Sequence, residues 1–272
     1  MGYRTEPLSS NIAQNIDRIY NNISKCYDIA EKKGATIYSP QNSNNLPATI
    51  ASIPQGEPAR QLGTFAQGDI VRVPFVNDTL RDHIVLRHGA PNATMYHGWG
   101  DSVFLIQRHA FSPRISRMQS VYSGSGQDLY LRNEYPAIIA PHIWEMVVEG
   151  RIPHATGNSA GTIQQGINGL LVKAFVLSHT EIGLPSTAAV FGIGADFGLF
   201  TSDASRIWRT SMDVGEIQHT RAVNTNVTLA PGIQAGGTFG PGHTLAQLMG
   251  VRPVIVLPSA TLVGDNNVLI GG

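Results

Sequence analysis

The chain has 272 residues, enough for one large domain or two small ones, and its 19 basic residues equal its 19 acidic residues, so its net charge is zero. This balance argues against binding nucleic acid without regard to sequence, because such binding depends on neutralising phosphates. The single cysteine, Cys26, excludes an intrachain disulfide.

The N-terminal residues lack the basic start and apolar run of a secretory signal. No stretch of the sequence reaches the roughly 18 uninterrupted apolar residues of a membrane span. We therefore expect a protein that is made in a cytoplasm, stays soluble and is not inserted in a membrane. If it acts outside a cell, we expect it to leave by lysis or as part of a particle.

Residues 11–33 are predicted to form a helix, because apolar residues recur there in alternating steps of four and three. These apolar positions are Ile12, Ile16, Ile19, Ile23, Cys26 and Ala30. The spacing is that of a coiled-coil seam, and isoleucine at both seam positions favours three or more strands. We therefore expect the four isoleucines to join copies of the chain. The alternative is a helix that packs on its own domain.

A short second helix is expected at residues 47–53. The segment that follows, with Pro54, Gly56 and Pro58, is typical of a domain boundary. The sequence therefore predicts a helical attachment and oligomerisation segment at residues 1–62 and a second domain at residues 63–272.

The second domain is predicted to be α+β, with short strands, two helices and long loops. The expected elements are strands at 69–75, 83–86 and 102–106, helices at 127–133 and 141–150, and strongly buried strands at 170–177 and 251–257. Residues 183–250 are rich in Gly, Thr and Asn and show little helical periodicity, so we expect functional loops there.

Several segments, taken in order, resemble a C-type-lectin-like domain found in prophage tail and surface proteins of gut bacteria. They are GDIV (68–71), IVLRHGAP (84–91), RHAFSPR (108–114), YSGSGQDLYLRNEY (122–135), IPHATG (152–157), KAFVLSHTEIG (173–183), WRTSM (208–212) and GVRPVIVLPSATLV (250–263). The N-terminal part is similar to the helices that open phage tail and fibre proteins.

This resemblance implies a lectin-like fold whose first and last strands lie close together. It also implies display on a virion beside other virion proteins, often as a homotrimer. One segment departs from the family pattern W-x-R-S-P, because Thr210 and Met212 occupy the arginine and proline positions after Trp208. A ligand contact made by that arginine is therefore not carried over to this chain.

Motifs typical of enzymes lack their structural context. Residues 157–161 match G-x-S-x-G, but no buried strand leads into Ser159 and no helix follows, so a surface loop is expected. Gly192, Gly194 and Gly198 do not have the spacing of a dinucleotide fingerprint. We expect no catalytic residues and no cofactor.

The nine histidines form no HExxH or HxH pair, and the acidic residues are scattered, so we expect no metal site. The residues around Gly250-Val251-Arg252-Pro253 are expected to close the fold, with Arg252 paired internally.

A candidate ligand face remains in the turn-rich region, where a flat ring, planar cations and amides occur together. Its residues are Trp208, Arg209, His219, Arg221, Asn224 and Asn226. The alternative for Trp208 is packing in the core, where a lone tryptophan near a strand is more often found.

Two functions are compatible with these features. The first is a bacteriophage virion protein, of the tail, fibre or baseplate, that binds a host-surface glycan or protein through its loops. The second is an architectural decoration, collar or head-fibre protein whose loops contact neighbouring subunits. The long loop region favours the first, whereas the low charged fraction of 14% and the 29 glycines favour the second.

Overall fold

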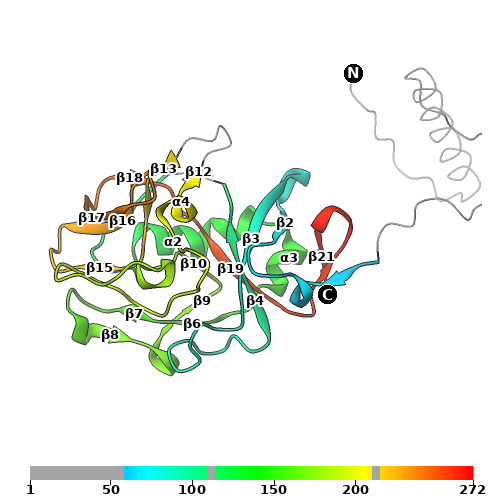
Figure 1. Ribbon diagram of the computed structural model, residues 1–272, viewed down its shortest axis with the longest axis horizontal. Coiled ribbons are helices and arrows are strands. Elements are labelled where there is room, and N and C mark those ends of the chain that lie inside the picture. Colours follow the sequence, from blue (N-terminus) through cyan, green and yellow to red (C-terminus); the bar gives the residue numbers. More distant parts are fainter. Residues whose placement is uncertain (1–57, 110–113, 210–214, 272) are drawn as a thin grey trace, which may run out of the picture. The chain divides into compact units, whose positions relative to one another are not determined.

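A computed structural model describes residues 58–109, 114–209 and 215–271 of this chain (Figure 1). The predicted oligomerisation residues Ile12, Ile16, Ile19 and Ile23 lie outside the described residues, as does the short helix expected at 47–53. Among the described residues, no helix is long and apolar enough to cross a membrane.

The largest sheet has five strands in the order β10-β19-β4-β3-β2, and all neighbouring strands are antiparallel. The strands are β2 (Ile70–Pro74), β3 (Leu80–His88), β4 (Ser102–Gln107), β10 (Ala174–Phe175) and β19 (Val254–Pro258). All six residues of β4 are buried, because this apolar run lies between two neighbours and is covered on both faces. The sheet therefore forms the centre of the hydrophobic core.

Aromatic rings fill the core beside β4. The ring of Phe104 lies 5.3 Å from those of both Trp99 and Phe197, and the ring of Phe175 lies 6.4 Å from it. The tilted and edge-on arrangements of these pairs are the ones that aromatic quadrupoles favour. This cluster connects the central sheet to the loop that carries Phe197.

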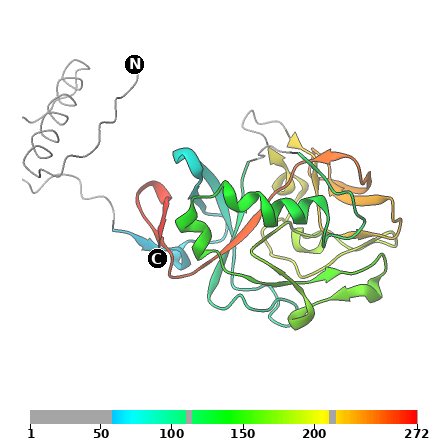
Figure 2. The same cartoon turned by 180° about the vertical axis from the view of Figure 1, so that it is seen from behind.

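Three short helices occur in the described chain: α2 (Gly126–Asn133), α3 (Pro141–Met146) and α4 (Asp203–Arg206). The Ser125 hydroxyl caps α2 by accepting a hydrogen bond from the backbone N–H of Asp128. Pro141 begins α3, where its missing N–H is not needed. Figure 2 shows α2 and α3 lying across one face of the strands.

The first and last strands belong to one three-stranded sheet, the terminal sheet. Its strands, in the order β1-β20-β21, are β1 (Arg60–Gln61), β20 (Leu262–Val263) and β21 (Leu269–Gly271). Leu62, directly after β1, is fully buried in the core. Residues 60–62 therefore pair and pack with the domain expected at 63–272.

The remaining strands form small antiparallel pairs and one further three-stranded sheet. They are β5 (Ile115–Ser116) with β18 (Leu248–Met249), β6 (Gly150–Ile152) with β9 (Leu170–Val172), β7 (His154–Ala155) with β8 (Ile163–Gln164), β11 (Val190–Phe191) with β15 (Val223–Asn224), β12 (Trp208–Arg209) with β13 (Gly215–Glu216), and β14 (Gln218–His219) with β16 (Leu229–Ile233) and β17 (Phe239–Thr244). Single 3-10 turns connect many of them: η2 (Leu62–Thr64), η3 (Val76–Asp78), η4 (Tyr135–Ala137), η5 (Ala160–Thr162), η6 (Gly166–Asn168), η7 (Thr180–Ile182) and η8 (Asp265–Asn267).

The predicted fold class is wrong. We expected an α+β architecture with a coiled-coil-like segment followed by a lectin-like domain. The described chain instead consists mostly of small antiparallel sheets with three short helices, and it shows no helical coiled-coil segment. The reason is that many of its strands have two residues, which is too short to produce a periodic pattern in the sequence.

Two element predictions also need correction. Residues 170–177 do not form one strand, because β9 ends at Val172 and β10 begins at Ala174 in a different sheet. Residues 183–250 are not one continuous loop, because they contain α4 and the eight strands from β11 to β18. By contrast, the strands expected at 69–75 and 102–106 and the helix expected at 127–133 are confirmed.

Candidate functional site

The structure does not bring the six predicted ligand residues together on one exposed face. Trp208, Arg221 and Asn224 are buried, with exposed fractions of 0%, 0% and 3%. Asn226 is exposed in the turn between β15 and β16. The backbones of Arg209 and His219 belong to β12 and β14, and their side chains lie outside the described part. Trp208 therefore takes the alternative role, packing in the interior.

Arg221 forms a fully buried ion pair with Glu181, which lies in η7. Its guanidinium donates to Glu181 Oε1 and to the carbonyl oxygen of Pro153. The Tyr96 hydroxyl donates to the same carboxylate oxygen, and the backbone N–H of Ser178 donates to Oε2 at 2.7 Å. These donors join four separate segments of the chain around one carboxylate.

Burial has the largest effect on the pKa values of the Glu181 carboxyl and the Tyr96 hydroxyl. Desolvation raises the pKa of Glu181, while Arg221, Tyr96 and the Ser178 backbone counteract that rise. Desolvation likewise raises the pKa of Tyr96 well above its ordinary value. The arrangement is closed to substrate, because both members of the ion pair are 0% exposed.

Arg117 is a second buried arginine that holds loops. Its Nη1 donates to the carbonyl oxygens of Thr220 and Ala222, each at 2.9 Å, and its Nη2 donates to Ser120 O at 2.9 Å. Burial lowers its pKa to about 10. Arg117 therefore fixes the chain on both sides of Arg221.

Arg206, the last residue of α4, is the third such arginine. Its Nε donates to Ile182 O at 2.8 Å, and its Nη2 donates to Gly183 O and Phe200 O, each at 3.3 Å. Its Nη1 pairs with Asp203 at 2.9 Å. We call Arg117, Arg206 and Arg221 the arginine clamps, because each joins backbone segments that are distant in sequence.

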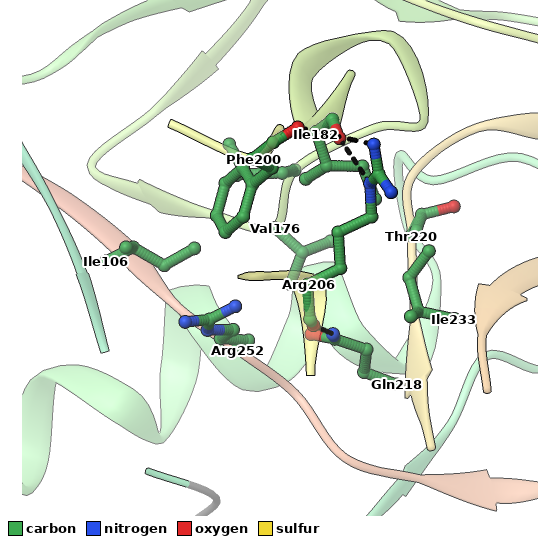
Figure 3. Close-up of a pocket in the computed structure, with 10 residues that line it drawn as sticks. Ile106, Val176, Ile182, Phe200, Arg206, Gln218, Thr220, Ile233 and Arg252 are labelled. Atoms are coloured by element: carbon green, nitrogen blue, oxygen red, sulfur yellow. Dashed lines mark hydrogen bonds between the residues drawn. The ribbon is translucent and has the colours of Figure 1, made fainter. Parts of the chain in front are cut away.

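A small cavity of about 20 Å³ lies beside Arg206 (Figure 3). It is lined by Ile106, Val176, Leu177, Ile182, Phe200, Arg206, Gln218, Thr220, Ile233 and Arg252. Arg252 is 6% exposed, and its Nε donates to Gln107 O at 2.9 Å. In the described chain it has no carboxylate partner, so the expected internal pairing is to a backbone carbonyl and not to an acid. Its guanidinium carbon lies 5.5 Å from the centre of the Phe200 ring.

An open polar cleft lies next to the terminal sheet. It is lined by Pro58, Arg60, Arg72, Val263, Gly264, Asp265, Asn266 and Asn267. Asn266 and Asn267 both have positive φ, at 57° and 59°, which asparagine tolerates better than most residues. Asn267 is held by Arg60 at 3.4 Å and donates to Ile70 O at 3.1 Å.

Exposed apolar side chains are spread over the domain, and they include Ile167 in η6, which is 71% exposed, Leu129 in α2 and Leu171 in β9. Met118 and Leu248, 72% and 61% exposed, belong to the β5–β18 end, where the Met118 N–H donates to Leu245 O. Val227, 59% exposed, lies in the turn before β16. Leu80 in β3 and Ile270 in the terminal sheet are 48% and 51% exposed. Figure 1 shows β16, β17 and β18 at the opposite end of the domain from β21.

Histidine side chains are the next candidates for a metal site or for an altered pKa. No group of three or more His, Cys, Asp or Glu side chains within the described ranges has the arrangement of a metal site. Burial lowers the pKa of His83 to about 4 and that of His179 to about 3. The expected surface loop at 157–161 is confirmed, because bends follow β7 there and Ser159 is followed by the single 3-10 turn η5 and not by an α-helix.

Sequence reasoning missed the arginine clamps at Arg117 and Arg206, and it missed Glu181, the acidic partner of Arg221. No motif surrounds Arg117 or Arg206. Glu181 follows the apolar run KAFVL after only three residues, and a charge so near a buried strand is the one signal that indicates an interior ion pair.

Residues 100–259 match the family described as Domain of unknown function (DUF6273). No solved structure matches this chain. The matched segment contains all three arginine clamps, Glu181 and Arg252, whereas the residues that line the open polar cleft lie outside it. Because the match covers more than half of the chain, this protein belongs to the DUF6273 family.

Proposed function

We propose that this chain is a bacteriophage virion protein that binds a host-surface glycan or protein and is not an enzyme. The observation that carries this proposal is the set of arginine clamps beneath the turn-rich region. They supply order where the strands themselves are too short to do so. The binding surface is the end of the domain that carries β5, β16, β17 and β18.

Rigid loops are what a binding surface of this kind needs. A loop that is ordered before it meets its partner does not lose its conformational entropy on binding, so more of the contact energy remains as affinity. Arg117 and Arg221 together hold residues 220–222, just before the strand and turn that present Asn226 and Val227. The interior charges thus support an exposed turn without contacting the ligand.

The exposed side chains at this end are suited to contact. Met118, Val227 and Leu248 are each more than half exposed, and Asn226 adds an amide beside Val227. Flexible Met side chains adapt to irregular partners, and an apolar surface with nearby amides fits a sugar face or a protein. We call these four residues the outer surface.

Competition for phage adsorption tests the proposal. Purified full-length chain is added to host cells before the particles released from the source bacterium, and free particles are counted. We expect the chain to reduce adsorption saturably. At least about tenfold more of the double variant Met118→Asp, Leu248→Asp should be needed for the same reduction in adsorption, because the variant places charge in the contact.

The matched control is the double variant Leu80→Asp, Ile270→Asp, which alters equally apolar, half-exposed positions away from the outer surface. It should compete within about twofold of the unaltered chain. An equal loss of competition in both double variants would contradict the receptor role. So would the absence of competition by the unaltered chain at high concentration. An antibody against the chain that fails to label the particles would contradict the virion assignment.

A specific observation favours the architectural role as a second candidate. The open polar cleft lies where the chain enters the domain at Pro58, and it carries two arginines beside Asp265 and Asn266. Such mixed polar surfaces are typical of non-obligate subunit contacts. In this case a charge reversal at Arg60 would lower the copy number of the chain in particles, measured by quantitative mass spectrometry, while adsorption per incorporated copy stays unchanged.

A further inference from the structure

Arg252 is buried, and within the described chain its positive charge has no acidic partner. Arginine keeps its charge in proteins, and burying a charge is costly unless a partner neutralises it. Of its five N–H donors, the one on Nε is used by Gln107 O, and no hydrogen bond engages Nη1 or Nη2 within the residues that the structure describes. The neighbouring Arg206 is different, because Asp203 and three carbonyl oxygens engage it.

Arg252 and Phe200 both line the cavity (Figure 3). Burial lowers the pKa of Arg252 to about 10, and no acidic group counteracts that shift. The Phe200 ring, with its centre 5.5 Å from the guanidinium carbon, offsets part of the positive charge. The cavity is lined otherwise by aliphatic side chains, the Thr220 hydroxyl and the Gln218 amide.

The size of the cavity limits its occupant. A site needs roughly 10–15 Å³ of such volume to hold one water molecule. The 20 Å³ beside Arg252 is therefore room for a particle of about that size. Gln218 Nε2 uses one hydrogen on Arg206 O at 3.1 Å, and its second hydrogen remains as a further donor at the cavity wall.

We propose that this cavity binds a single halide-sized anion, chloride in the cell, against the guanidinium of Arg252. A monatomic anion matches the size of the cavity, neutralises a buried arginine whose only hydrogen-bond partner in the described chain is one carbonyl oxygen, and tolerates an apolar wall. The bound ion would join the residues that precede β19 to Phe200 and to β14, and so connect the central sheet to the turn-rich region. Nothing in this proposal depends on the virion role.

Thermal unfolding of the full chain tests the site in solution. Sodium chloride is compared with sodium gluconate at equal ionic strength, so that general screening is the same and only the small anion enters the cavity. The Tm should rise by roughly 3–6 °C for each tenfold increase in chloride above its dissociation constant, and gluconate should have no such effect. Arg252→Met should abolish the chloride dependence, whereas Arg108→Met, at an exposed arginine, should preserve it.

Crystals of the unaltered chain grown with bromide provide a second measurement that does not depend on whether the variant folds. An anomalous scattering peak in contact with the Arg252 guanidinium is expected. Water in the cavity together with equal Tm values in chloride and gluconate overturns the proposal. A bromide peak without any chloride effect in solution also overturns it, since it shows an adventitious ion only.

Discussion

The central sheet and the turn-rich region between residues 183 and 250 are built in opposite ways. In the sheet, β3 has nine residues and β4 has six, and the buried side chains between its strands and helices are mostly apolar. In the turn-rich region, six of the eight strands have two residues each. There the buried side chains include Arg206, Arg221, Gln218 and Thr220.

This difference shows how a chain can satisfy its buried backbone carbonyl groups where strands supply few hydrogen bonds. A strand of two residues satisfies few backbone groups, and a buried carbonyl without a partner costs free energy. A guanidinium carries five donors, so one arginine can satisfy several carbonyls at once. The turn-rich region thus uses buried charge where the central sheet uses ladder hydrogen bonds and apolar packing.

The largest effect is expected from breaking a clamp. Arg221→Met should lower the free energy of unfolding by about 3–5 kcal/mol, because it leaves the Glu181 carboxylate buried without its cation. Chemical denaturation measures the loss, and hydrogen exchange should show protection lost in the turn-rich region before the central sheet.

The control for that variant is Arg108→Met, which removes a surface partner of Asp82 at 3.3 Å. It should cost about 0–1 kcal/mol. The double variant Glu181→Leu, Arg221→Met should be less destabilised than Arg221→Met alone, because no unpaired charge remains. If the double variant is worse than the single one, the clamp is not acting through charge.

Next in size is the loss of packing in the sheet. Leu105→Ala should cost about 2–5 kcal/mol, since Leu105 is fully buried in β4 and its neighbours cannot close the cavity. The matched change Ile193→Ala removes the same number of carbons from a small apolar cluster of the turn-rich region and should cost only about 2 kcal/mol. Equal losses in denaturant titrations would remove the distinction between the two regions.

The smallest expected effect near neutral pH comes from His83, because its contribution to stability is lost only as the pH falls. The folded chain holds the pKa of His83 at about 4, below its ordinary 6.5, because the imidazole is desolvated. Between pH 4 and 6.5 the His83 imidazole is therefore protonated in the unfolded chain and neutral in the folded chain. The free energy of unfolding falls as the pH is lowered from 6.5 to 4. The full loss amounts to about 3 kcal/mol.

Unfolding free energies at several pH values measure this slope. His83→Gln should flatten the slope by up to one proton, and His142→Gln controls for removing an imidazole from the surface. A slope that is identical in His83→Gln and in the unaltered chain would show that His83 is not buried as a neutral ring.

How far the sequence predicts the structure follows the same division between regions. Strands β2 and β4 and helix α2 were predicted closely, because apolar spacing and turn residues define elements of five residues or more. The two-residue strands of the turn-rich region have no such pattern, so the sequence predicts loops there and the predicted fold class is wrong. The one strand expected at 170–177 is two strands because the chain changes sheets after Val172, a tertiary event that local pattern does not show.

The candidate site was less predictable than the fold. Trp208 and Arg221 have the residue types of a binding face, yet both are 0% exposed. Whether an arginine reaches solvent or a carbonyl depends on segments distant in sequence, such as Pro153 and Glu181 for Arg221. The exposed Met118 also gives no signal in the sequence, since it lies where residues 115–118 meet the distant residues 245–249.

The terminal sheet has a consequence for the connectivity of the domain. Because β1 and β21 both pair with β20, and neighbouring strands lie about 4.8 Å apart, the two strands are separated by only about 10 Å. A linker of roughly four residues spans that distance. The domain should therefore tolerate circular permutation, with its old ends fused and new ends opened in the exposed turn at residues 225–228. The order in which the strands are made would then differ, while the set of strand partners stays the same.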